Sequence, residues 1–280
     1  MSISSEILFS SSALRIYRVR CRPDDHGCGP VEQVTADHVV YPLRGIFVKH
    51  HGPAERVVAD CCHALFFKAG EPYRVSHPVG GDECLSLEPS GELLAGIPFR
   101  ARVAPLGAQG IAARKLLSHR LERRVASPLE AEERALDLLC AIAPAPSSAK
   151  LVAARAGARH GEMVEAIQII LARSPGRPWT LGELAKSVHS SPFHLARVFR
   201  RLTRTSLHQY QQHVRLAAAL DEVLDTSRDL TTIALDLGFS SHSHFTASFR
   251  AGFGVTPSFL RRSARVASSK ILTARERAAS

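Results

Sequence analysis

The sequence of 280 residues lacks the features that would mark a secreted or membrane-spanning protein. Its first 20 residues carry no basic region followed by an apolar core, and no run of about 18 uncharged apolar residues is present to span a bilayer. Only six cysteines occur, and none lies between residues 141 and 280. We therefore expect a cytoplasmic protein that contacts no membrane and keeps its thiols reduced.

Aromatic residues are also scarce, at 6% of the chain, and Trp179 is the single tryptophan. Proteins that hold RNA or single-stranded DNA stack the bases on exposed aromatic rings. The shortage of such rings disfavours an RNA-binding protein, although the formal net charge of the chain is +10.

Acidic residues are scarce in one half of the chain only. Residues 151–280 hold 18 Lys and Arg against 9 Asp and Glu, whereas residues 1–150 hold 18 against 17. A local excess of cations is typical of a surface that binds a polyanion, because counterions are released when phosphates meet Lys and Arg. The alternative that charge alone leaves open is a basic, solvated surface without a partner.

Short apolar runs separated by glycine and proline fill residues 35–90. The runs are Val39–Val48, Arg56–Ala59, Ala64–Phe67 and Tyr73–His77. Many short strands at close spacing predict a small sandwich or barrel. Apolar residues then recur with a helical period over 111–125 and 129–142, and two prolines and two serines in 143–148 indicate a linker.

Two segments of the C-terminal half repeat one pattern. Leu181, Leu184, Ala185 and Val188 recur 49 positions later as Leu230, Ile233, Ala234 and Leu237, and Leu195, Phe199 and Arg200 recur 50 positions later as Phe245, Phe249 and Arg250. The one-residue difference falls where a turn is expected. Each copy is long enough for a helix, a tight turn and a second helix, which is the architecture of a DNA-reading helix-turn-helix.

Capping residues indicate where these helices begin. Thr180 has Glu183 at the capping-box position, and Ser191 followed by Pro192 suits an N-cap with proline at the first helical position. Asp229 and Ser241 are the expected caps in the second copy.

A helical stretch over 207–224 joins the two copies, and at 1.5 Å per residue it would span roughly 30 Å. Successive major-groove faces on one side of B-DNA lie about 34 Å apart. A stiff helix of this length would place two reading helices in adjacent grooves within one chain.

The predicted helix at 192–202 has a cationic face that no acid interrupts. It presents Phe193, His194, Arg197, Arg200, Arg201 and Arg204. Arginine can chelate the O6 and N7 atoms of guanine while its neighbours hold phosphates, and a phenylalanine can meet a thymine methyl group. The alternative is a solvated basic helix face.

Over about residues 160–262 the chain resembles the AraC/XylS family of bacterial transcription regulators. The matching residues are Leu184, Ala185, Ser191, Leu195, Arg197, Phe199, Tyr210, Arg215, Ala218, Ile233, Ala234, Gly238, Phe239, Phe245, Phe249, Gly254, Thr256, Pro257 and Ser258. The resemblance implies sequence-specific promoter binding and control of transcription initiation through contact with RNA polymerase. It implies base reading by Phe193, His194 and Arg197 in the first motif, and by His242, Ser243 and His244 in the second.

One position departs from the family pattern, because Ala247 stands where the family commonly has arginine. We therefore expect the first motif to carry base specificity and the second to act mainly as a phosphate clamp. The full set of predicted DNA-binding residues is Ser191, Phe193, His194, Arg197, Arg200, Arg201, His242, Ser243, His244 and Arg250.

Residues 66–77 resemble part of the cupin-type sensing domain that many members of this family carry, and the likeness extends over about residues 30–90. It implies effector sensing or dimerisation. The predicted ligand-binding residues, at the mouth of the barrel, are Glu71, Tyr73, Arg74 and His77. The alternative is that these four are exposed strand and turn residues.

Cysteines and histidines crowd the N-terminal half. They include Cys21, His26, Cys28, His50, His51, Cys61, Cys62, His63, His77 and Cys84. No C-x2-C pair is present, and neighbours in a strand, as Cys61 and Cys62 are expected to be, would point to opposite faces. We expect no metal site, no cofactor and no catalysis. The competing hypothesis is a cupin-like metal-binding enzyme, or a metal or redox sensor, with a DNA-binding tail.

Together these patterns predict an α+β protein of two domains. The expected segments are 1–105 (β-rich cupin-like barrel), 106–142 (helices, a candidate dimer contact), 143–155 (linker), 156–265 (DNA-binding domain of about seven helices with two helix-turn-helix motifs) and 266–280 (disordered tail). The apolar stripes of 106–142 would alternatively pack on the barrel. The expected partners are double-stranded promoter DNA, RNA polymerase, a small effector and a second copy of the chain.

Overall fold

The computed structural model describes residues 2–24, 27–52, 55–91, 93, 102–142, 158–264 and 266. The expected linker at 143–155 and all but one residue of the expected tail at 266–280 lie outside these ranges. Among the helices within them, none combines the length and the apolar character needed to cross a membrane.

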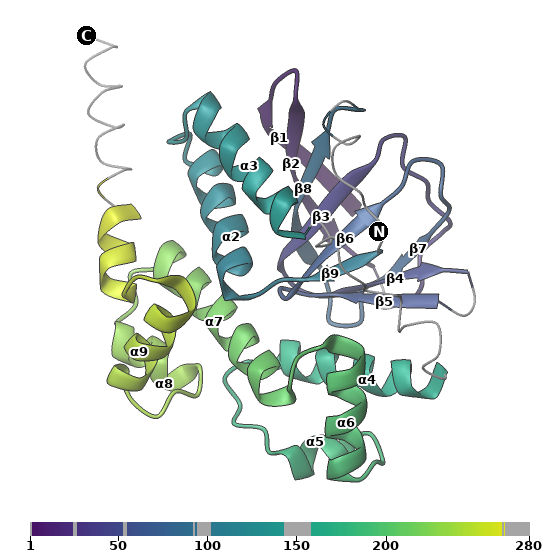
Figure 1. Cartoon of the computed structure of the whole chain (residues 1–280), viewed down its shortest axis with the longest axis vertical. Coiled ribbons are helices and arrows are strands. Elements are labelled where there is room, and N and C mark those ends of the chain that lie inside the picture. Colours follow the sequence, from purple (N-terminus) through teal and green to yellow (C-terminus); the bar gives the residue numbers. More distant parts are fainter. Residues whose placement is uncertain are drawn as a thin grey trace.

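The N-terminal part is built from antiparallel strands, as expected for its fold class (Figure 1). The strands are β1 (Ser2–Ser10), β2 (Leu14–Arg22), β3 (His38–Arg44), β4 (Phe47–His51), β5 (Glu55–Ala59), β6 (His63–Phe67), β7 (Arg74–Ser76), β8 (Asp82–Pro89) and β9 (Val103–Pro105). One sheet has the order β1-β2-β8-β3-β6-β9 and the other the order β5-β4-β7. Side chains from both sheets line a common cavity, which is the barrel arrangement expected of a cupin-type domain.

Two strands begin well before the run of apolar segments that predicted this domain. Most residues of β1 are exposed, and the polar run Ser4, Ser5 and Glu6 interrupts its apolar residues, so the strand lacks a regular apolar alternation by which to find it. β2 hydrogen-bonds to β8 and buries Leu14 and Ile16 in the core.

Two helices follow the strands, α2 (Ala108–Glu122) and α3 (Pro128–Ile142). Their apolar stripes are buried within the chain itself, because Leu117, Leu121 and Leu139 pack in the same core as the larger sheet. The hydroxyl of Tyr41 on β3 donates to the carbonyl of Leu138 at 3.2 Å. The apolar stripes of α2 and α3 therefore pack on the barrel, which was the alternative to a dimer contact, and they give no reason to expect a dimer.

The C-terminal part is helical throughout its described residues. The helices are α4 (Ala158–Arg173), α5 (Leu181–Ser187), α6 (Pro192–Thr203), α7 (Leu207–Asp225), α8 (Leu230–Asp236) and α9 (His242–Phe253), and residues 257–264 are also helical. α5 and α6 form one helix-turn-helix and α8 and α9 the other, with α7 between them (Figure 1). The predicted caps Thr180, Ser191, Asp229 and Ser241 all accept backbone N–H groups of the helices they precede.

The one-residue difference between the copies lies in the turns, as predicted. His189 and Ser190 separate the first pair of helices, whereas Gly238, Phe239 and Ser240 separate the second. The extra residue is accommodated because the ring of Phe239 is buried against Phe245, at a centroid distance of 5.1 Å.

α7 takes part in the cores of both units. Tyr210, Val214 and Ala217 pack with the first unit, whereas Leu220 and Leu224 pack with the second. The helix is thus buried around more of its circumference than a single apolar stripe would provide.

The loop after α4 also connects the two units. Arg215 of α7 is buried and donates from Nε to the carbonyl of Pro175 and from Nη2 to that of Arg177, both at 3.1 Å. Gly176 between them touches the turn of the second unit so closely that a Cβ on Gly238 would lie 2.3 Å from its carbonyl oxygen. Gly238 has a φ of +75°, which also favours glycine.

Replacing Gly238 by alanine tests this contact. We expect Gly238→Ala to lower the free energy of unfolding by about 3 kcal/mol or more, because a clash with backbone adds to the left-handed strain of about 1 to 2 kcal/mol. Gly254→Ala is the matched control, since its φ is +77° but nothing lies within 4 Å of an added Cβ. Denaturant unfolding that gave equal losses for the two variants would contradict the close approach.

A buried polar cluster joins the β domain to α7. Asp60, which lies between β5 and β6, accepts from the hydroxyl of Tyr210, from Nδ1 of His63 at 2.7 Å and from the N–H of Cys62 at 2.8 Å. Gln168 of α4 donates to the Tyr210 hydroxyl at 3.1 Å. Burial by itself would raise the pKa of Asp60, but its interaction with His63 and its hydrogen bonds hold the pKa below the ordinary value.

Tyr210→Phe removes one donor from this buried carboxylate. We expect a loss of about 1 to 3 kcal/mol in the free energy of unfolding at neutral pH. Because folding lowers the pKa of Asp60, its contribution is present above about pH 4 and is lost as the pH falls through the folded value, so the loss should shrink in acid. Tyr17→Phe is the control, since the Tyr17 hydroxyl has no hydrogen-bond partner among the residues described here. Equal urea midpoints for the two variants would refute the role of the cluster.

Candidate DNA interface and N-terminal cavity

The first candidate reading helix, α6, has one buried and one exposed face. Leu195, Val198 and Phe199 fill the core, and Ser191 caps the helix by accepting the N–H of His194 at 3.2 Å. Arg197 and Arg200 are exposed on the other face. Phe193 is also exposed there, at 78%, beside the two arginines of the same helix.

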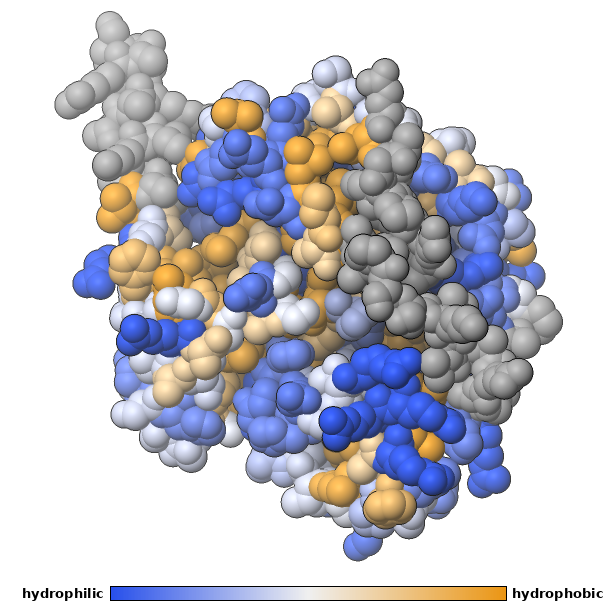
Figure 2. All heavy atoms as spheres, viewed as in Figure 1, coloured by the Kyte–Doolittle hydropathy of each residue, from blue (hydrophilic) through white to orange (hydrophobic). Residues whose placement is uncertain are grey.

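Two of the predicted residues on α6 point toward α4 instead. The rings of His194 and His160 lie 5.3 Å apart between centroids, and Arg201 donates to Nδ1 of His160 at 3.3 Å. The exposed set on this helix is thus centred on Phe193, Arg197 and Arg200. Figure 2 shows strongly hydrophilic side chains gathered over the part of the surface where α4 and α6 lie.

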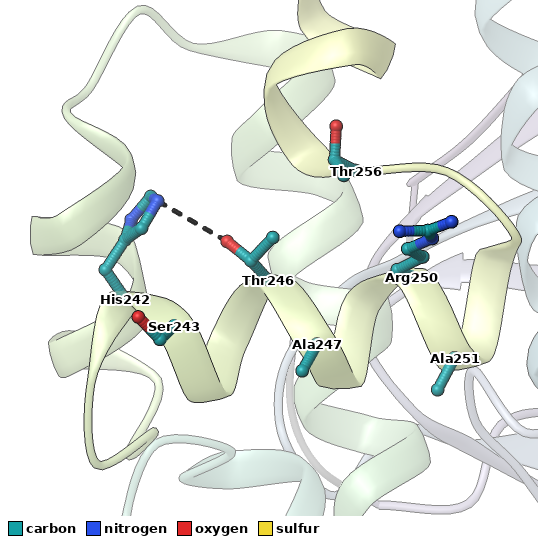
Figure 3. Close-up of a pocket in the computed structure, with 7 residues that line it drawn as sticks. All are labelled: His242, Ser243, Thr246, Ala247, Arg250, Ala251 and Thr256. Atoms are coloured by element: carbon teal, nitrogen blue, oxygen red, sulfur yellow. Dashed lines mark hydrogen bonds between the residues drawn. The ribbon is translucent and has the colours of Figure 1, made fainter.

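The second candidate reading helix, α9, borders an open groove (Figure 3). The groove is lined by His242, Ser243, Thr246, Ala247, Arg250, Ala251 and Thr256. His242 contacts Thr246 at 3.4 Å, whereas His244 lies beside it, with Nδ1 3.0 Å from the Ser240 hydroxyl. The sequence singled out His242, Ser243 and Arg250; the helical period from His242 would have added Thr246.

Both reading helices lie in stretches of sequence without any acid. No Asp or Glu occurs between residues 184 and 220 or between residues 237 and 275. The N-termini of α6 and α9 add partial positive charge from unpaired N–H groups. The two exposed faces are therefore suited to a polyanion, and neither is neutralised by an ion pair among the described residues.

The four predicted effector residues do not converge on one site. Tyr73 and His77 line a cavity of about 170 Å³ between the two sheets. Glu71 pairs with Nη1 of Arg102 at 2.6 Å, and Arg74 is exposed on an outer groove. The cavity is otherwise lined by apolar residues and by a second polar set that the sequence did not group. That set is Cys21, Glu32, His38, Asp82, Cys84 and Ser86.

The buried thiols are not activated as nucleophiles. Burial raises the pKa of Cys21 to about 12, and burial also raises that of Cys84 well above its ordinary value. Thiols with a raised pKa stay protonated and react poorly. Cys61 and Cys62 lie in a turn rather than in a strand, so the expectation that their sulfurs diverge is wrong: the two Sγ atoms are 3.9 Å apart.

Comparison with known proteins places the helical half in a family. A family model described as a helix-turn-helix domain matches residues 184–263. The chain is 33% identical to the HTH-type transcriptional regulator ArgR of Pseudomonas aeruginosa over 103 residues, which are 37% of this chain but only 31% of ArgR. It is 37% identical to the regulatory protein SoxS of Escherichia coli over 82 residues, which are 29% of this chain and 77% of SoxS.

Among solved structures, ToxT of Vibrio cholerae aligns with 89% of this chain and 98% of its own, at 10% identity and a TM-score of 0.36. The likeness to SoxS extends over 77% of that protein, and the family model covers most of the first helix-turn-helix unit and the whole of the second. The residues that the family model matches include α6, the joining helix α7, α8, α9 and the two turns described above. The chain therefore belongs to the AraC/XylS family of transcription regulators.

Proposed function

We propose that this chain binds promoter DNA by placing α6 and α9 in two successive major grooves, and that it regulates transcription from that position. The observation that carries the proposal is the pair of capped, acid-free helices whose exposed faces are held apart by one buried helix. α7 has 19 residues and so a length of about 28 Å, close to the groove repeat of about 34 Å. The relatives whose names describe regulators support the same role.

The two helices have different tasks in this proposal. Arg197 chelates a guanine edge and Phe193 contacts a thymine methyl group, while Ser191, Arg200 and Arg201 hold the backbone. His194, half-buried against α4, reads bases less directly. On α9, two small residues, Ala247 and Ala251, leave the groove shallow and without a long donor at its centre. His242, Ser243, His244 and Arg250 then act mainly on phosphates.

The β domain supplies control rather than catalysis. Its cavity of about 170 Å³ suits a small polar effector, with Tyr73 and His77 as two of its walls. Contacts between this domain and α7 would carry the effect to the reading helices, and RNA polymerase would be the protein partner at the promoter. A homodimer, expected from the sequence, stays a prediction.

Selection from a random duplex library by the full chain tests the proposal without knowledge of the promoter. We expect one enriched sequence with two half-sites about one helical turn apart. Arg197→Ala should weaken binding to it by about 1 to 3 kcal/mol, roughly 5- to 150-fold, and relax the preference at one base. His244→Ala should cost less, because its ring is engaged by Ser240 and Phe239.

Arg134→Ala, which removes the same charge from α3 in the N-terminal part, is the control and should leave affinity unchanged. Equal losses for Arg197→Ala and His244→Ala would contradict the assignment of specificity to α6. A library from which nothing is enriched would contradict DNA reading itself.

A further inference from the structure

Three potential metal ligands converge in the cavity of the β domain. A thiol of Cys21, a ring nitrogen of His77 and a carboxylate oxygen of Asp82 all lie within 4.8 Å of one another. Nε2 of His77 is 2.7 Å from Oδ2 of Asp82. His77 and Asp82 are 2% and 7% exposed, so bulk water screens this pair poorly.

Strand register explains how these distant residues meet. Cys21 on β2 is paired directly with Asp82 on β8, so their side chains point to the same face of the larger sheet. Cys84 follows Asp82 by two residues on that face, and its Sγ donates to Oδ1 of Asp82 at 3.2 Å. His77 follows β7 in the smaller sheet and reaches the cluster from the opposite wall.

We propose that Cys21, His77 and Asp82, with Cys84 as the fourth ligand, form a binding site for a zinc-class divalent cation inside the β domain. Two thiolates, one imidazole and one carboxylate are ligands that Zn²⁺ takes in tetrahedral sites. Bond lengths of about 2.0 to 2.3 Å place such ligands roughly 3.3 to 3.8 Å apart. The observed spacing, within 4.8 Å, reaches this geometry through side-chain rotation, and the two thiols would give up their protons to solvent as the ion binds.

The sequence pattern could not show this site, because its ligands come from two strands, β2 and β8, and from the residue that follows β7. The absence of a C-x2-C pair excludes only sites built on one hairpin or loop. A second cluster, Asp60 with Cys61 and Cys62, fits an ion less well. Both oxygens of Asp60 already accept hydrogen bonds from His63, Cys62 and Tyr210.

The site lies next to a contact with the DNA-binding domain. Gly45 packs on Asp82 so closely that an added Cβ would lie 2.9 Å from the Asp82 Cβ. The preceding residue, Arg44, forms ion pairs with Asp225 at 2.6 Å and with Asp221 at 3.7 Å, both on α7. Occupation of the site would therefore be transmitted to the helix that sets the spacing of the reading helices; this step, unlike the site itself, rests on the proposed function.

Metal binding is tested first, with Zn²⁺ alone and chelator-stripped full-length protein. Equilibrium dialysis should give one ion per chain. Co²⁺ in its place should produce the thiolate-to-metal charge-transfer absorption and the intense visible bands of a tetrahedral site. Cys21→Ser and Asp82→Asn should each weaken binding at least tenfold. Cys21→Ser should also reduce the charge-transfer absorption of the bound form, because one thiolate is left, whereas Asp82→Asn keeps both thiolates and should retain that absorption once Co²⁺ is bound. Cys140→Ser, which removes an exposed thiol outside the cavity, should change neither.

The wild-type protein alone is enough to overturn the site, either by binding no Zn²⁺ or by binding Co²⁺ without thiolate absorption. Binding that persists unchanged in Cys21→Ser would equally refute it. A DNA-binding assay with and without Zn²⁺ then tests the coupling, for which a change in affinity is expected. If dialysis shows the ion but DNA affinity is unchanged, the site stands and the coupling is wrong. Failure of the protein to bind any DNA would instead refute the proposed function.

Discussion

The relative position of α6 and α9 depends on the burial of α7. This helix is buried around most of its circumference, and its two ends belong to the cores of two different helix-turn-helix units. Because protein interiors are close-packed, neither unit can turn about α7 without opening voids. The hydrogen bonds that Arg215 donates to the loop at 175–177 oppose the same rotation. The close contact of Gly176 in that loop with Gly238 of the second unit opposes it too. The same packing therefore fixes both the spacing of α6 and α9 and their relative orientation.

The same helix fixes the two domains relative to each other. Near its start, Tyr210 donates to the buried Asp60 of the β domain. Near its end, Lys115 of α2 lies 2.8 Å from Asp221 and 2.9 Å from Asp225, and Arg44 pairs with both carboxylates. The buried contact between Tyr210 and Asp60 is costly to break, because it would leave a buried carboxylate short of a donor, whereas the ion pairs of Arg44 and Lys115 are partly exposed to solvent and contribute less. The β domain and α2 therefore contact α7 near both of its ends, and α7 in turn packs against both helix-turn-helix units.

The helical half could be predicted in detail from sequence because its signals are local. Caps such as Thr180 and Ser241 act on residues three positions away, and the repeat itself located the turns. For the N-terminal half, only the fold class could be predicted from sequence, because strand pairing joins residues that are far apart in the chain. β1 has no apolar alternation, and the cluster of Cys21, His77 and Asp82 exists only through register. His194 and Arg201 were expected in a face that α4 partly covers, because that contact crosses more than thirty residues.

The two copies of the motif differ most in what holds them to the β domain. The first unit is attached through α4, where Ile169 and Ala172 pack on Ile46, Val48 and Val58, on and beside the smaller sheet. The second unit is attached through α2, whose Ala112 and Leu116 enter its core, and α2 itself packs on the larger sheet. The cavity of about 170 Å³ lies between these two sheets. Any change in the separation of the sheets would therefore reach α6 and α9 through different contacts, because the first unit packs on the smaller sheet and the second on α2.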